Sequence, residues 1–227
     1  VPVRTVLLIF CAAISTSEDM MYRHWLKLCV LTIVMLAGNA QAAVILVFGD
    51  SISAAYGLET QQGWVHLMTQ RLDSSAPGKH KVVNGSLSGE TTSGGVRRLP
   101  ELLRQHRPDI VILELGGNDG LRGQPPVLME KNLLQMVTTA KSAGATVILL
   151  GMKIPPNYGK AYTTSFEKVF VQVSQASGSA LLPFFLEGVG GNPALMQRDG
   201  VHPVAQAQKR LLDNVWPLLA RELKKHR

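Results

Sequence analysis

The chain has 227 residues, 46% of them hydrophobic, and its excess of Lys and Arg gives a formal net charge of +7. This composition excludes wholesale disorder and allows one large or two small domains. The basic residues are dispersed without a basic face carrying base-stacking aromatics, so we expect no nucleic-acid partner, although the charge is compatible with transient contact with an anionic membrane surface.

Residues 20–42 have the pattern of a secretory signal peptide. A start at Met20-Met21 is followed by a basic segment, an apolar core at 28–36 and the small-x-small site Ala40-Gln41-Ala42. The apolar core is shorter than the roughly 20 residues that span a bilayer. We therefore predict cleavage after Ala42 and a periplasmic or secreted protein, with an uncleaved anchor as the alternative.

Residues 1–19 lie upstream of this start site, and we expect them to be a non-native extension. Both cysteines, Cys11 and Cys29, precede the predicted cleavage site. The mature segment 43–227 therefore has no disulfide and no thiolate for catalysis or metal binding. Its length fits a single domain, for which a monomer is the default expectation.

Apolar runs alternate with amphipathic stretches along the mature segment. In chain order we expect a strand at 43–48, a helix at 64–72, a strand at 82–84, a helix at 96–106, a strand at 110–115, a helix at 127–143, a strand at 146–150, a helix at 162–177, a strand at 180–185 and a helix at 204–223. Pro217 is expected to kink or interrupt the last helix. Uniformly apolar strands alternating with helices predict an α/β fold, a three-layer α/β/α sandwich around a parallel sheet.

The first strand ends in Gly49-Asp50-Ser51. An apolar run that stops at a glycine and then presents Asp-Ser is typical of a buried strand followed by a tight turn, at the sheet edge where open α/β folds bind ligands. We interpret Ser51 as a candidate nucleophile and Asp50 as a residue that braces the turn and borders the substrate. Because the same tripeptide is ordinary turn composition, the chemistry depends on partners elsewhere.

The loop Asp199-Gly200-Val201-His202 supplies those partners. A lone histidine at the start of a helix is most often a surface residue. Here, however, Asp199 precedes His202 by three residues, a spacing that lets the carboxylate bind imidazole Nδ1 and leave Nε2 for Ser51. We therefore predict His202 as the base and Asp199 as the acid that orients it.

Two further loops can donate to an oxyanion at the same edge of the sheet. Gly116-Gly117-Asn118-Asp119 places a side-chain amide after one strand, and Ser88-Gly89-Glu90 places a glycine N–H after another. With the N–H of Ser51, we predict Gly89 and Asn118 as the oxyanion hole. Both loops are also compatible with ordinary turns.

These four blocks, in this order, resemble the signature blocks of the SGNH (GDSL) hydrolase superfamily. The segment 113–123 is most similar to the secreted bacterial acyl-CoA thioesterase I/protease I/lysophospholipase (arylesterase) type of esterase, with support from 156–159 and 182–185. The resemblance implies a flavodoxin-like, mostly five-stranded parallel sheet, the triad and oxyanion hole named above, and a cleft bordered by the loop after Asp119. One departure is Ile52, where the motif has Leu, a swap of similar size that we expect to matter little.

We therefore predict an enzyme without a metal or cofactor that cleaves acyl esters, thioesters or lysophospholipids through an acyl-enzyme. Leu121, Pro155 and Tyr158 are the residues we expect to border the acyl chain, while Glu114 is expected to be a hydrogen-bonded structural group. A carbohydrate O-acetylesterase of the same superfamily is the alternative enzyme. A flavodoxin-like protein that binds without catalysis is the alternative of another class.

Overall fold

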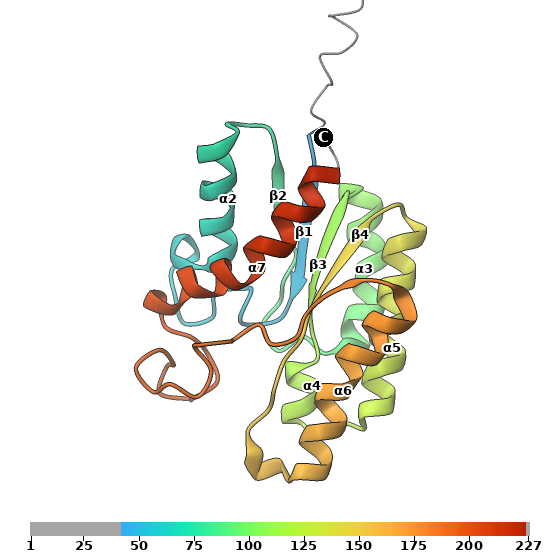
Figure 1. Ribbon diagram of the computed structural model, residues 1–227, viewed down its shortest axis with the longest axis vertical. Coiled ribbons are helices and arrows are strands. Elements are labelled where there is room, and N and C mark those ends of the chain that lie inside the picture. The colour runs from blue at the N-terminus through green and yellow to red at the C-terminus, as the bar shows by residue number, and fades with distance from the viewer. Residues whose placement is uncertain (1–41, 226–227) are drawn as a thin grey trace, which may run out of the picture. The chain divides into compact units, whose positions relative to one another are not determined.

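The computed structural model describes residues 42–225 (Figure 1). The predicted upstream extension 1–19 and all of the predicted signal peptide except Ala42 lie outside these residues. The elements are β1 (Val44–Gly49), η1 (Thr60–Gln62), α2 (Trp64–Ser75), β2 (Lys81–Asn84), α3 (Thr92–His106), β3 (Ile110–Glu114), α4 (Gly117–Leu121), α5 (Pro126–Ser142), β4 (Thr146–Leu150), η2 (Pro156–Tyr158), α6 (Lys160–Ser177), β5 (Ala180–Leu182) and α7 (Ala205–Lys225). Alternating strands and helices confirm the predicted α/β class.

The five strands form one parallel sheet in the order β2-β1-β3-β4-β5. The chain moves outward from β1 to β2 and then crosses back to β3 on the other side of β1. Such a reversal opens a crevice at the carboxyl ends of the two central strands, which is where doubly wound folds bind ligands. The turn after β1 carries Ser51, and the turn after β3 carries Asn118.

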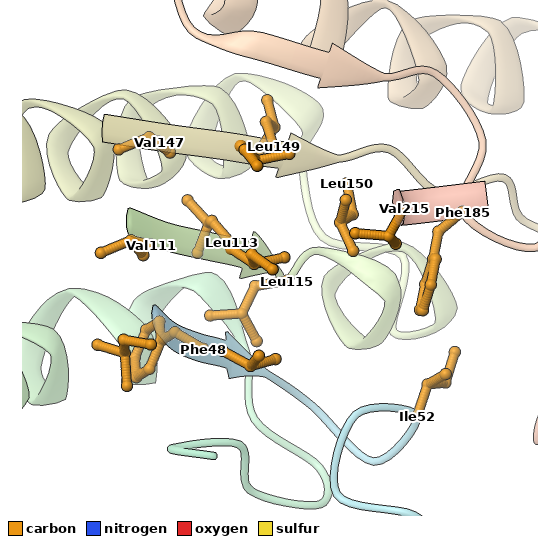
Figure 2. Close-up of a cluster of buried hydrophobic side chains, with 14 of the residues drawn as sticks. Phe48, Ile52, Val111, Leu113, Leu115, Val147, Leu149, Leu150, Phe185 and Val215 are labelled. Atoms are coloured by element: carbon orange, nitrogen blue, oxygen red, sulfur yellow. The ribbon is translucent and has the colours of Figure 1, made fainter. Parts of the chain in front are cut away.

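Helices cover both faces of this sheet (Figure 1). Helices α2 and α7 contact each other on one face, and α5 contacts α3 and α6 on the other, as right-handed crossovers require. The side chains of the central strands are buried on both faces, and these strands are apolar except for Glu114 at the end of β3. Figure 2 shows this core continuing from the sheet to the loops and to α7, where Phe185 and Val215 lie near Leu150.

The structure differs from the sequence expectation mainly in three helices and in β5, which ends at Leu182 and not at the predicted Phe185. Helix α3 starts four residues earlier than predicted because Thr91 caps it, its side chain accepting the N–H of Gly94. The predicted turn at 116–120 contains the short helix α4, whose first turn presents Asn118. Helix α7 runs to Lys225 without interruption at Pro217. Within residues 42–225, no helix has both the length and the hydropathy needed to cross a bilayer.

Candidate active site

Ser51 lies on a tightly packed turn directly after β1. A Cβ on Gly49 would lie only 2.5 Å from Oε2 of Glu114 and 2.9 Å from Oγ of Ser53, so a side chain at this position would displace the two hydrogen-bonded groups beneath the turn. Ile52, the departure from the motif, is buried behind the turn in the apolar core. The Ser51 side chain itself is largely buried but borders a cavity.

The turn brings Ser51 to the histidine predicted as its base. Ser51 Oγ lies 2.8 Å from His202 Nε2, and His202 Nδ1 lies 2.7 Å from Asp199 Oδ2. With Nδ1–H donated to Asp199, Nε2 is free to accept the serine proton. The structure thus brings together three predicted residues, two of them separated from Ser51 by about 150 positions in the chain.

Asp199 is held by its own loop. Its Oδ1 accepts the backbone N–H groups of Val201 at 2.9 Å and His202 at 3.0 Å, which leaves Oδ2 for the imidazole. Desolvation acts to raise the pKa of Asp199, but these hydrogen bonds and the His202 ring prevail and lower it to about 2. The carboxylate is therefore ionised throughout the neutral range.

Asn118 is oriented by Asp50. The Asn118 amide donates to Oδ2 of Asp50 at 3.1 Å, while Oδ1 of Asp50 accepts the N–H of Ile52, also at 3.1 Å. Burial raises the pKa of Asp50 to about 6, against the lowering effects of the Ile52 N–H and of His202. One amide hydrogen of Asn118 remains available for an oxyanion. Asp50 thus braces the turn as expected, and it also touches the cavity.

Gly89 has the backbone conformation that its predicted role requires. Its φ of +78° is in the left-handed region that favours glycine, and its carbonyl accepts Nη2 of Arg122 at 3.1 Å. Within residues 42–225, the N–H groups of Ser51 and Gly89 have no hydrogen-bond acceptor. Both residues line the same cavity as Asn118, so the three predicted oxyanion donors share one site.

Asp119 connects two of the site loops. Its carboxylate accepts the Oγ1–H of Thr92 at 2.6 Å and the backbone N–H of Thr92 at 2.9 Å. Thr92 begins α3, immediately after the Gly89 loop, whereas Asp119 belongs to α4. This contact fixes the loop that carries Gly89 relative to the helix that carries Asn118.

The cavity beside Ser51 has a volume of about 760 Å³. Most of the cavity wall is apolar, and the loops after β4 and β5 contribute much of this apolar surface. The apolar residues include Leu121, Met152, Ile154, Phe184, Leu186 and Met196. Such a lining suits an apolar ligand with its polar end at Ser51.

Of the three residues predicted to border an acyl chain, two line the cavity and one does not. Leu121 and Pro155 line the cavity. Tyr158 does not: its hydroxyl donates to the carbonyl of Leu121 at 2.8 Å, which braces the wall from outside. A sequence pattern cannot distinguish a residue that lines the cavity from one that braces it, because the difference depends on the tertiary contact between Tyr158 and Leu121.

Glu114 lies fully buried beneath the nucleophile turn. Its Oε2 accepts Ser53 Oγ–H at 2.7 Å and the N–H of Asp50 at 3.3 Å, so it is hydrogen-bonded as expected. Its other oxygen, Oε1, has no partner among the described residues. Burial, and secondarily the charge of Asp50, raises the pKa of Glu114 well above its ordinary value, which favours the neutral acid at this position.

Two residues of the site carried no signal in the sequence. Tyr56 places its ring 4.5 Å from the His202 ring, centre to centre, and lines the cavity. The Gln197 side chain donates to the carbonyls of Tyr56 at 2.8 Å and Pro203 at 3.2 Å, joining the Ser51 and His202 loops. Neither residue belongs to a motif, and both contacts join distant parts of the chain. In the part of the chain described, no cluster of three or more His, Cys, Asp or Glu side chains could hold a metal ion.

Comparison with known proteins places this site in a wider group. Residues 47–210 match the GDSL-like Lipase/Acylhydrolase family. The chain is 51% identical over 189 residues to Esterase TesA of Pseudomonas aeruginosa, covering 83% of this chain and 94% of that protein. It is 41% identical over 184 residues to Thioesterase 1/protease 1/lysophospholipase L1 of Escherichia coli K12, covering 81% and 86%. The crystal structure of TesA superposes with a TM-score of 0.77 at 51% identity, covering 79% of this chain and 99% of that one.

Proposed function

The chain belongs to the GDSL-like lipase/acylhydrolase family, and on that premise we propose that its Ser51, His202 and Asp199 hydrolyse acyl esters and thioesters through an acyl-enzyme. That the chain is an ester hydrolase of a serine-hydrolase family follows from its close relatives. Our proposal extends this conclusion in three ways: it assigns the triad, it adds thioesters and lysophospholipids as substrates, and it gives the location of the protein. Membership in the family removes the non-catalytic binding protein from consideration.

The observation that carries the triad is the pair of short contacts on His202. Ser51 Oγ at 2.8 Å can transfer its proton to Nε2 as the oxygen attacks the substrate carbonyl. Asp199, at 2.7 Å from Nδ1, stabilises the imidazolium that results. Nε2 then returns the proton to the leaving oxygen or sulfur as its bond to the acyl carbon breaks. A water molecule activated by the same nitrogen releases the fatty acid and restores Ser51.

The negative charge of each tetrahedral intermediate requires donors that are already in place. The N–H groups of Ser51 and Gly89 and the amide of Asn118 surround the cavity end at which Ser51 lies. Their neighbours hold them rigidly, Asp50 for Asn118 and Arg122 for the Gly89 loop. Prearranged donors of this kind avoid the cost of reorganisation during the reaction.

The cavity favours acyl chains longer than acetate. Its volume of about 760 Å³ is far larger than an acetyl group needs, and its wall is largely apolar. This supports a fatty acyl substrate, including the lysophospholipid and thioester substrates that the name of the Escherichia coli relative indicates for that protein. A carbohydrate O-acetylesterase would need polar groups to hold the sugar, so we rank it second.

Export would place this activity in the periplasm or outside the cell. The support is the signal-peptide pattern at 20–42, together with the cleavage site that ends at Ala42. We also propose a monomer that contacts membranes transiently, since its lipid-like substrates reside there. Cell fractionation with N-terminal sequencing tests the first proposal: a cytoplasmic protein that retains residues 20–42 would contradict export.

The decisive experiment is a series of p-nitrophenyl esters from acetate to palmitate, run beside a lysophospholipid assay. We expect kcat/KM to rise with chain length beyond acetate and lysophospholipid to be cleaved. Ser51→Ala should abolish both activities and labelling by a fluorophosphonate. Activity confined to acetate would support the O-acetylesterase, and a fully active Ser51→Ala variant would refute the proposed nucleophile.

A further inference from the structure

The exposed apolar side chains of the protein gather at one edge of the sheet. Among residues 42–225, the large hydrophobic side chains that are exposed are Tyr56, Leu87, Val127, Leu128 and Val171. Single exposed apolar residues are ordinary on a protein surface. Here, however, all of them except Val171 lie in segments that follow the carboxyl end of a strand, whereas Val171 lies past the middle of α6. Such a concentration indicates an interaction surface.

The topology of the chain places these residues at the edge where the cavity opens. Tyr56 belongs to the turn after β1 and lines the cavity. Leu87 belongs to the loop after β2, two residues before Gly89, which also lines the cavity. Val127 and Leu128 lie in the first turn of α5. This helix begins at the same edge because it leads from the carboxyl end of β3 back to the amino end of the parallel strand β4.

One hydrogen bond joins the start of α5 to the loop that carries Leu87. Leu128 and Asn132 lie one turn apart on the same face of α5, and the Asn132 amide donates to Oγ1 of Thr92 at 3.0 Å. Thr92 begins α3, directly after the loop of Leu87. The two leucines, each 50% exposed, are therefore held on neighbouring segments. Val127, beside them, is the most exposed at 68%.

The charge of the protein favours an anionic partner. The chain carries a net charge of +7, and three exposed cations lie at this edge: Arg122, Lys153 and Lys160. None of the three forms an ion pair within residues 42–225. Exposed carboxylates occur there as well, on Glu187 and Asp199. We therefore expect the net charge to attract the protein to an anionic surface and the apolar side chains to hold it there.

We propose that Tyr56, Leu87, Val127 and Leu128, together the apolar rim, dock the protein on an anionic lipid surface with the cavity facing the lipid. The inference rests on the proposed lipid substrates and names the surface by which they are reached. Apolar side chains on separate segments can enter the boundary between headgroups and acyl chains without forming a groove. A second copy of the chain on the same rim would instead cover the opening that leads to Ser51.

The test measures flotation with vesicles of mixed phosphatidylglycerol and phosphatidylcholine, and with vesicles of phosphatidylcholine alone. The variants are Leu87→Gln and the double variant Val127→Gln/Leu128→Gln, since glutamine is polar and tolerated in helices. Val171→Gln is the matched control because it removes an exposed apolar side chain of α6 away from the rim. All proteins are produced from the full chain and compared as recovered from the cell, so that any retained leader contributes equally.

We expect the double variant to bind the mixed vesicles at least about 10-fold more weakly than the parent, and Leu87→Gln about 3-fold more weakly. The Val171→Gln control should stay within about 2-fold of the parent, because its side chain does not reach the lipid. On p-nitrophenyl butyrate in solution, kcat/KM of every rim variant should also stay within about 2-fold, because a soluble ester needs no docking. Hydrolysis of lysophosphatidylglycerol held in vesicles should fall together with binding.

Equal binding by the parent and the double variant, or an equal loss in Val171→Gln, would overturn the inference. A parallel loss on p-nitrophenyl butyrate would do so as well, because it would place the rim in the catalytic site. Binding of the parent that is equally strong on phosphatidylcholine alone would contradict the anionic partner. A lipid-free dimer that the double variant dissociates, seen by sedimentation equilibrium, would assign the rim to a second copy.

Binding also separates this inference from the proposed function. Ser51→Ala should float with the mixed vesicles as the parent does, since docking needs no nucleophile. A parent that binds these vesicles through the rim but leaves lysophosphatidylglycerol uncleaved would contradict the proposed substrate and support the docking surface.

Discussion

Replacing Asp50 by Asn should shift the stability difference in favour of the variant as the pH rises, and it should lower activity. Asp50 is 2% exposed, and burial raises its pKa to about 6 from an ordinary 3.8. The folded state therefore holds the proton more tightly than the unfolded chain. The stability associated with this group is fully present below pH 3.8 and is lost as the pH rises through about 6.

The magnitude follows from these two pKa values. Between pH 4 and pH 8 the ionisation of Asp50 should cost the folded protein about 2.5 kcal/mol. Asp50→Asn removes this cost. It also weakens the hydrogen bonds from Asn118 and Ile52, but the stability lost in this way differs little between the two pH values. The stability difference between variant and parent should therefore move in favour of the variant by about 2.5 kcal/mol from pH 4 to pH 8.

The assay is urea unfolding at four or five pH values between 4 and 8. Asp73→Asn serves as the matched control, because Asp73 is an exposed aspartate of α2 and its replacement removes the same charge. In parallel, kcat/KM of Asp50→Asn should fall at least about 10-fold because an amide, with one acceptor oxygen in place of two, holds Asn118 less firmly. A stability difference between variant and parent that is constant with pH, or that moves toward the parent from pH 4 to pH 8, would refute the burial argument for Asp50.

Two other substitutions test the catalytic geometry. Asp199→Asn should lower kcat on the order of 10³–10⁴-fold, since the amide cannot hold the Nδ1–H tautomer of His202; burst kinetics with p-nitrophenyl butyrate measure this, and a loss under about 10-fold would contradict the assigned role. Asn118→Ala should lower kcat about 10²–10³-fold with a small change in KM, because the amide matters most in the transition state; a change confined to KM would make Asn118 a binding residue instead.

The fold was predictable because its signals are local. Uniformly apolar segments such as 110–113 are buried on both faces of the sheet, and the helical periods between them dictate crossovers. The errors lie at helix ends, at the end of β5 and in α4. A threonine cap at Thr91 extends α3, and the Gly-rich turn at 116–120 closes into a helix because Gly120 N–H reaches the Gly116 carbonyl at 2.9 Å.

The site was predictable in part for the same reason. Asp199 and His202 are close in sequence, so their contact can be inferred from spacing alone. Asp50 was expected to brace the turn, but its bond to Asn118 joins the ends of two strands and no spacing reveals it. Tyr56 and Gln197 contribute through contacts between the loop after β1 and the loop before α7, and these contacts form only in the folded chain.

The loop that carries Asp199 and His202 is a small closed unit. Met196 pairs with Pro203 as an antiparallel bridge, and Gln197 N–H donates to the His202 carbonyl at 2.7 Å. The oxyanion donors, by contrast, are held by the sheet edge and by α4. We therefore expect local opening of this loop to remove the base while the sheet and its anion-binding groups stay intact, so that activity is lost before the fold.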